Sequence, residues 1–249
     1  FGNTVTETAN FMIDNSAPVL SAYADDAECV RGIPLAVNPS LINFAITAED
    51  LGCGTFEHGD IVVTMTSSSG LPLVGNLTTD GSTGTTFHYA YTVSHLDPTG
   101  AVNITFDLMD SKGNIATQYS PADDEFSIDN TAPTLALTAD KSCVLVGDEV
   151  TFTLDASDLG CATFDVSNIS ASIAGDANAT LSAITQALDG SSQPIPDTYT
   201  FTYTVDAADS GLLTISADAA DALGNMATTS TFDVTVDLNP LTLAVNLPQ

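Results

Sequence analysis

The sequence contains almost no positive charge. It has 3 Lys and Arg residues against 32 Asp and Glu residues, so the formal net charge is −29 over 249 residues. Proteins that bind nucleic acid neutralise phosphates with Lys and Arg side chains, so this composition excludes a nucleic-acid partner. It also disfavours docking on an anionic lipid surface, unless a metal ion bridges the two. The acidic excess requires cations, supplied either by bulk salt or by divalent ions bound at particular carboxylates.

Long apolar runs and tryptophan are missing as well. No run approaches the 18 or so residues of a membrane-spanning helix, so we expect no direct membrane insertion. The chain has no Trp, and most Tyr and Phe residues fall on predicted core faces, which disfavours a sugar-binding surface. The motifs GxSxG and HExxH are absent. The protein is therefore predicted not to be an enzyme.

The strongest positive signal is an internal repeat. FMIDNSAP at 11–18 returns as FSIDNTAP at 126–133, and EDLGCGTF at 49–56 returns as SDLGCATF at 157–164. DSKGN at 110–114 matches DALGN at 221–225. Because these landmarks recur in one order, the sequence predicts two repeats, residues 14–128 and 129–236.

Each repeat is predicted to be all-β. Apolar and polar residues alternate at 87–93 and again at 199–205, as in strands with one buried face. In the first repeat, strand-like runs lie near 18–24, 41–48, 61–67, 71–78, 85–93, 101–109 and 115–127. This number of short strands is typical of an immunoglobulin-like sandwich. The predicted fold is all-β, with tandem immunoglobulin-like Greek-key β-sandwiches.

The two ends of the chain also carry repeat sequence. Residues 1–13 match the last strand of a preceding repeat, and residues 237–249 match the linker and first strand of a following one. Two interpretations remain open. The chain is either a segment of a longer tandem array or a subunit whose end strands complete a neighbour's sandwich. The expected partners are neighbouring Ig-like repeats or copies of the chain itself.

The IDNTAP linker, the DxxGN turn before the last strand and a repeat of about 110 residues resemble bacterial Ig-like domains of large cell-surface proteins. The resemblance implies an extracellular, cell-surface structural protein that acts as a spacer, stalk or lattice element. It also implies calcium at the junctions between domains. Two alternatives stay open: a self-assembling filament or S-layer subunit joined by strand exchange, and an adhesin module that binds a receptor or glycan.

The positions of the acids favour the same cofactor, calcium. In an immunoglobulin-like sandwich, the segment leading into the first strand and the loops after the second and sixth strands lie at one pole. A calcium ion takes about 6–8 oxygen ligands, and clustered carboxylates supply them. The alternative is that these residues only form turns. The candidate ligands are Asp14, Asn15, Glu49, Asp50, Asp107, Asp110 and Asn114 in the first repeat, and Asp129, Asn130, Asp155, Asp158, Asp218, Asp221 and Asn225 in the second.

The four cysteines form two equivalent pairs. An even number of cysteines in an exported repeat protein favours disulfides, and the simplest pairing is Cys29–Cys53 and Cys143–Cys161. However, the loops after the first and second strands lie at opposite poles of a sandwich, which exceeds the reach of a disulfide unless the first strand breaks early. Pairing of Cys29 with Cys161 of the next repeat, or free thiols, are the alternatives. Metal binding is disfavoured, since no CxxC motif or nearby His is present.

Overall fold

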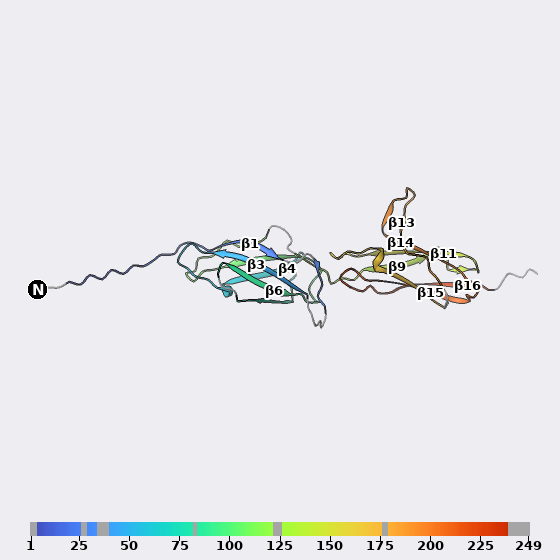
Figure 1. Ribbon diagram of the computed structural model, residues 1–249, viewed down its shortest axis with the longest axis horizontal. Coiled ribbons are helices and arrows are strands. Elements are labelled where there is room, and N and C mark those ends of the chain that lie inside the picture. The colour runs from blue at the N-terminus through green and yellow to red at the C-terminus, as the bar shows by residue number, and fades with distance from the viewer. Residues whose placement is uncertain are drawn as a thin grey trace, which may run out of the picture. The chain divides into compact units, whose positions relative to one another are not determined.

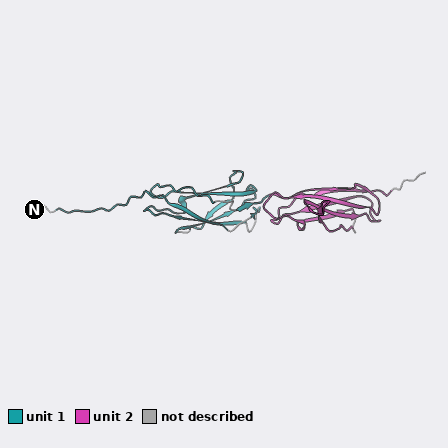
Figure 2. Ribbon diagram, turned by 90° about the horizontal axis from the view of Figure 1, so that it is seen from above, with its two compact units in different colours: residues 1–130 teal, residues 131–249 magenta. Residues whose placement is uncertain are grey.

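The computed structural model describes residues 4–25, 29–33, 40–81, 84–121, 126–175 and 179–238. It divides into two compact units, residues 1–130 and 131–249 (Figure 2). No helix within these described ranges is both long and apolar enough to cross a membrane.

The first unit is a sandwich of two four-stranded sheets. One sheet has the order β1 (Val19–Asp25), β3 (Leu41–Glu49), β6 (Thr86–Thr92) and β5 (Asn76–Thr79). The other has the order β2 (Cys29–Val30), β8 (Phe126–Ile128), β7 (Gly100–Leu108) and β4 (Ile61–Ser67). The short 3-10 turn η1 (His58–Asp60) precedes β4. The strand pairs are antiparallel except for β2 and β8, which run parallel.

The second unit repeats this topology (Figure 1). Its first sheet has the order β13 (Thr185–Leu188), β14 (Pro194–Thr204), β11 (Glu149–Ser157) and β9 (Thr134–Ala139). Its second has the order β10 (Cys143–Val144), β16 (Ser230–Val236), β15 (Gly211–Ala219) and β12 (Ile169–Ala174), with η2 (Val166–Asn168) before β12. In both units the chain moves from one sheet to the other after its first strand and pairs parallel with the last strand. The prediction of tandem immunoglobulin-like sandwiches is confirmed.

The core of each unit follows the predicted alternation. In β3 the side chains of Ile42, Phe44 and Ile46 are buried, and in β6 those of Tyr89 and Tyr91. Successive strand residues point to opposite faces, so one face of each sheet fills the sandwich. The Phe44 and Tyr89 rings stack across β3 and β6, with their centroids 5.3 Å apart. The rings of Phe152 and Phe201 repeat this stack in the second unit at 5.1 Å, and each fully buried side chain of this size contributes about 1.5–3 kcal/mol.

Two predicted strands of the first repeat are shorter than the sequence suggested. The run at 71–78 is reduced to β5 (Asn76–Thr79) and a bridge at Pro72. The run at 115–127 consists of bridges at Ile115 and Tyr119, followed by β8, and residues 122–125 lie outside the described ranges. The bridge between Met109 and Ile115 closes the DSKGN turn, as that between Ala220 and Met226 closes DALGN.

The N-terminal segment differs from its repeat equivalent. Within the described ranges, residues 4–13 join no sheet, and Phe11 and Ile13 are 81% and 74% exposed. Their equivalents Phe126 and Ile128 are 2% and 0% exposed in β8. Of the predicted linker and first strand at 237–249, residues 239–249 lie outside the described ranges.

Candidate functional site: a carboxylate cluster in the first repeat

Three aspartates from distant segments converge in the first unit. Asp14 lies on the segment before β1, Asp50 directly after β3, and Asp110 two residues after β7. One carboxylate oxygen of each lies within 4.8 Å of the other two. We call these three residues the Asp14 cluster. Like charges at this separation repel one another unless a cation or a proton is shared between them.

The DSKGN turn fixes Asp110 in the cluster. Its Oδ1 accepts hydrogen bonds from the backbone N–H groups of Lys112 (2.8 Å) and Asn114 (2.9 Å), and its Oδ2 accepts one from the Asn114 amide (2.8 Å). Gly113 closes the turn with a φ of 89°, in the left-handed region that favours glycine. Burial acts to raise the pKa of the Asp110 carboxyl, but the hydrogen bonds from Asn114, Lys112 and Gly113 outweigh it and hold the pKa below its usual value. The carboxylate is therefore ionised at neutral pH.

Asp50 contributes an oxygen with no donor. Its Oδ1 accepts a hydrogen bond from the backbone N–H of Gly52 at 2.8 Å, whereas its Oδ2 is buried and has no hydrogen-bond partner. A buried carboxylate oxygen without a donor costs about 1–3 kcal/mol or more. Such an oxygen beside two further carboxylates is best satisfied by a cation.

Glycines on either side of Cys53 make room for the cluster. A Cβ atom on Gly52 would lie 2.1 Å from Oδ1 of Asp14, and one on Gly54 would lie 2.6 Å from Oδ2 of Asp110. The backbone N–H of Gly54 also donates a hydrogen bond to Oδ2 of Asp14. The LGCG segment at 51–54 therefore packs its backbone directly against the carboxylates.

The second repeat carries the equivalent acids in the same local geometry. Oδ1 of Asp221 accepts from the backbone N–H of Asn225 at 2.8 Å, and Oδ2 accepts from the Asn225 amide at 2.5 Å. Gly224 closes this turn with a φ of 81°. Asp158 and Asp221 each offer a carboxylate oxygen within 4.8 Å of the other. The DxxGN turn thus presents its first aspartate in the same way in both repeats.

The remaining predicted acids make other contacts. Asp107 accepts two 3.0 Å hydrogen bonds from the Gln118 amide, Asp218 accepts one from the Thr229 hydroxyl, and Asp155 accepts one from the Thr198 hydroxyl at 3.1 Å. All three acids lie within strands, whose side chains project from the face of a sheet rather than from its end. Asn15 and Glu49 are exposed.

Asn130 belongs to a different network. Its Oδ1 accepts the backbone N–H of Gly32 at 2.8 Å, and its Nδ2 donates to the carbonyls of Ser94 (3.0 Å) and Asp97 (2.9 Å). Its backbone N–H donates to the Thr99 hydroxyl at 2.9 Å. The amide of this linker residue therefore holds the loop between β6 and β7 of the first unit.

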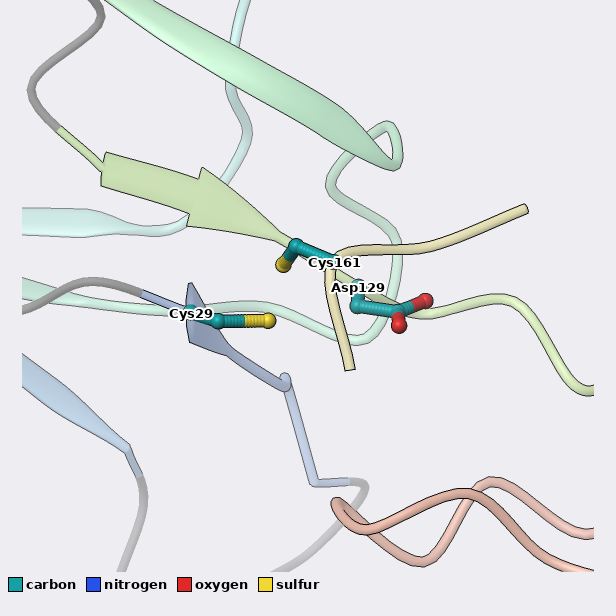
Figure 3. Close-up of side chains that lie close together, drawn as sticks. All are labelled: Cys29, Asp129 and Cys161. Carbon is teal, nitrogen blue, oxygen red and sulfur yellow. The ribbon is translucent and has the colours of Figure 1, made fainter. Parts of the chain in front are cut away.

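The cysteine pairing within repeats is wrong. Cys29 and Cys161 are disulfide-bonded, whereas Cys53 and Cys143 are free, so neither Cys29–Cys53 nor Cys143–Cys161 forms. The parallel pairing of β2 with β8 holds Cys29 beside Ser127, away from the loop that follows β3. Figure 3 shows Cys29 at the start of β2 and Asp129 directly after β8, with the Cys29 sulfur and an Asp129 carboxylate oxygen within 4.8 Å of each other.

Sequence reasoning missed two buried aspartates. Asp97 and Asp209 are 3% and 2% exposed, and each accepts a 2.7 Å hydrogen bond from a tyrosine hydroxyl, Tyr91 and Tyr203 respectively. In both repeats a tyrosine is followed six positions later by an aspartate, and this recurrence is the sequence signal that could have identified the two residues.

Comparisons with known proteins agree with this architecture. Residues 85–179 match the family model of the bacterial Ig-like domain, group 3. The predicted resemblance to bacterial Ig-like domains is confirmed. The matched stretch runs from the start of β6 past β12, and so includes the DNTAP linker. No curated protein sequence matches the chain.

Several solved structures are similar to this chain at low identity. The Escherichia coli adhesin FdeC is 18% identical, with 92% of this chain and 67% of that chain covered and a TM-score of 0.40. The D00-D0 domain of intimin is 16% identical, with 85% and 99% covered and a TM-score of 0.38. The fibronectin(III)-like modules of Clostridium thermocellum CbhA are 17% identical, with 90% and 100% covered and a TM-score of 0.30.

Proposed function

We propose that this chain is a structural segment of an extracellular cell-surface protein, in which bound calcium stiffens successive Ig-like units into a spacer, stalk or lattice element. The observation that carries the proposal is the Asp14 cluster. It gathers carboxylates from three distant segments and buries one Asp50 oxygen without a donor. The bacterial Ig-like match supports the cell-surface role.

Calcium is the cation that suits this donor set best. The Asp14 cluster offers only carboxylate oxygens, which hard cations such as calcium and magnesium prefer, whereas zinc and copper favour His and Cys. Calcium also accepts irregular geometry and completes its coordination with backbone carbonyls and water. The net charge of −29 adds a favourable long-range attraction for any divalent cation.

The stiffening role follows from the place of the aspartates in the repeat. Asp14 and Asp129 both occupy the DN linker before a first strand, and the backbone N–H of Asp129 donates to the Val30 carbonyl at 2.8 Å. A cation held by a linker carboxylate and by loops of the following sandwich would restrain the linker. Without it, the repulsion between the carboxylates would favour a looser linker.

Titration calorimetry with calcium tests the proposal on a matched pair of variants. Asp50→Asn removes one charge from the Asp14 cluster, and Asp107→Asn removes one from a carboxylate of the same unit that bonds to Gln118. We expect Asp50→Asn to weaken or abolish one calcium site and Asp107→Asn to bind as the wild type does. Absence of calcium binding to the wild type, or equal losses in both variants, would contradict the proposal.

A second candidate, a filament or S-layer subunit joined by strand exchange, is favoured by one observation. The apolar side chains of Phe11, Met12 and Ile13 are exposed, whereas Phe126 and Ile128 at the equivalent positions are buried in β8. A segment of this kind could add the last strand to another sandwich. Sedimentation of the wild type and of a Phe11→Ser, Ile13→Ser variant tests this candidate. Self-association that the variant loses would favour it, and a monomeric wild type would exclude it.

A further inference from the structure

The buried aspartates Asp97 and Asp209 occupy equivalent positions in the two units. In each, Oδ2 accepts a 2.7 Å hydrogen bond from the tyrosine six positions earlier. The same oxygen also accepts the backbone N–H three positions earlier, from Ser94 at 2.8 Å in the first unit and from Asp206 at 2.7 Å in the second. The two carboxylates are therefore oriented in the same way.

The other carboxylate oxygen differs between the units. Oδ1 of Asp97 accepts the backbone N–H groups of Val74 (2.6 Å) and Gly75 (3.1 Å), which precede β5. Oδ1 of Asp209 is buried and has no hydrogen-bond partner in the part of the chain that the structure describes. Buried polar atoms of folded proteins are satisfied by protein groups, water or a bound ligand. The first unit shows that this oxygen position accommodates two donors, and the second unit leaves both places to a ligand.

A surface pocket of about 340 Å³ lies beside Asp209. Its lining includes Tyr203 and Asp206, the two residues that donate to Oδ2 of Asp209. One wall is formed by residues 179–182, which precede β13, the strand that takes the place of β5 in the second unit. The pocket therefore lies on the side from which Asp97 receives its backbone donors. Further hydroxyl groups in the lining come from Thr180, Ser182, Thr202 and Thr204.

The charge of Asp209 is not balanced by a bonded basic side chain. Residues 131–249 contain one basic residue, Lys141, and its Nζ donates to the Glu149 carbonyl at 2.6 Å. Asp206, which lines the pocket and is exposed, adds a second negative charge. A buried charge is costly unless an opposite charge accompanies it. A water molecule would supply donors to Oδ1 without neutralising the carboxylate, whereas a cation does both.

We propose that the second unit binds a small monovalent cation, an ammonium group or an alkali metal ion, between Oδ1 of Asp209 and the hydroxyl groups of the pocket. One buried carboxylate among neutral hydroxyls balances a single positive charge, whereas the three carboxylates of the Asp14 cluster suit a divalent ion. Because Oδ1 is buried, the ion must lose water to reach it, which excludes bulky cations. The site goes beyond the proposed function, since it makes the second unit alone dependent on monovalent cations.

Hydrogen exchange of the full chain, followed by mass spectrometry, tests the site. The protein is compared in the chlorides of ammonium, potassium, sodium and tetramethylammonium at one ionic strength, with a chelator present to remove calcium. The reporters are peptides from residues 198–209 and from their equivalents in the first unit, 86–97. A cation at tenfold excess over its dissociation constant should slow exchange about tenfold in the second unit only, relative to tetramethylammonium. A larger effect of ammonium than of potassium would identify an N–H donor, and the reverse an alkali metal ion.

Asp209→Asn and Asp97→Asn form a matched pair, because each removes one buried carboxylate. We expect Asp209→Asn to abolish the cation dependence of the second unit and Asp97→Asn to retain it. Asp206→Asn keeps the backbone bond to Asp209, so it serves as a second variant if Asp209→Asn does not fold, and it should weaken the dependence.

Three results would overturn the inference. Equal exchange of the wild type in all four salts would mean that water satisfies Oδ1 of Asp209. Equal slowing of both units would assign the effect to screening of the acidic surface. Cation dependence that persists unchanged in Asp209→Asn would place the ion elsewhere. Since calcium is absent throughout, the outcome does not depend on the Asp14 cluster.

Discussion

The Tyr91 hydroxyl donates a 2.7 Å hydrogen bond to Oδ2 of Asp97 inside the first unit. The Asp97 carboxylate, 3% exposed, also accepts the backbone N–H groups of Val74 (2.6 Å), Gly75 (3.1 Å) and Ser94 (2.8 Å). Asp97 thus joins β6 to the segment before β5 and to the loop after β6, which lie at the same end of the sheet. The Tyr203–Asp209 bond repeats this relationship in the second unit at 2.7 Å.

Replacing Tyr91 by Phe should destabilise the first unit by about 1–3 kcal/mol, because a buried charged acceptor loses a donor. The backbone N–H of Gly75 also loses an acceptor, since it donates to the Tyr91 hydroxyl at 2.7 Å. Urea denaturation of the variant and the wild type measures the difference.

Tyr89→Phe is the matched control. Tyr89 points into the same core from the same strand, but its hydroxyl is buried without a hydrogen-bond partner. Removing an unsatisfied hydroxyl should leave the free energy of unfolding unchanged or raise it. Equal destabilisation by both substitutions would show that ring packing, rather than the bond to Asp97, sets the effect.

Alkaline pH should destabilise the first unit. Burial raises the pKa of Tyr89 from its ordinary 10.0 to about 12, and burial together with the bond to Asp97 raises that of Tyr91 further. A raised folded-state pKa contributes stability that is complete below the unfolded pKa and is lost as pH rises through the folded one. The free energy of unfolding should therefore fall from about pH 10 upward, with a smaller slope in Tyr89→Phe. A flat profile in the wild type would contradict this assignment.

The sequence predicted the fold because its signals are local and recur. The alternation through Phe87, Tyr89 and Tyr91 marks a half-buried strand without knowledge of its partners. It predicted Asp50 and Asp110 as cluster members because each follows a strand in a turn. The sequence did not distinguish Asp107 from Asp110, which is only three positions further along. Asp107 lies within β7 and projects from the face of the sheet, whereas Asp110 follows β7 and lies at the end of the sheet.

Long-range relationships were less accessible. That Cys53 is free rather than bonded to Cys29 depends on how the first strand divides into β1 and β2, which no local pattern encodes. Asp97 was missed because an aspartate before Pro98 and Gly100 has the appearance of a turn residue. Only tertiary packing buries it beneath Tyr91.

Thiol labelling should separate the four cysteines into two classes. Iodoacetamide under denaturing, non-reducing conditions should modify Cys53 and Cys143 and leave Cys29 and Cys161 unmodified, because the latter two are disulfide-bonded. All four should be modified after reduction, and mass spectrometry identifies the sites. Protection of Cys53 in a monomeric sample would instead support a bond within the first repeat.

Calcium should raise the thermal stability of the protein. A ligand that binds only the folded state stabilises it by about 2.7 kcal/mol at a hundredfold excess over the dissociation constant. Calorimetric melting with calcium and then with a chelator measures the shift. Sodium chloride at matched ionic strength is the control, since an equal effect of sodium would assign the stabilisation to screening of the acidic surface.

Gly54→Ala should weaken calcium binding without unfolding the first unit. The new Cβ would lie 2.6 Å from Oδ2 of Asp110 and 2.8 Å from Oδ2 of Asp50. Both contacts are at the ends of side chains, so the carboxylates are displaced while the sheets stay packed. We expect the calcium affinity to fall about tenfold or more, as for other losses of support around a metal site.

Gly59→Ala is the control for that substitution, because a Cβ on Gly59 meets no atom within 4 Å. Calcium titration and urea denaturation of the two variants separate the effect on the site from the effect on folding. Equal calcium affinities of Gly54→Ala and Gly59→Ala would contradict the prediction. A bound cation would then depend on oxygens other than those of the Asp14 cluster. If Gly54→Ala lost stability in the absence of calcium, the glycine would serve the packing of the LGCG segment rather than the spacing of the ligands.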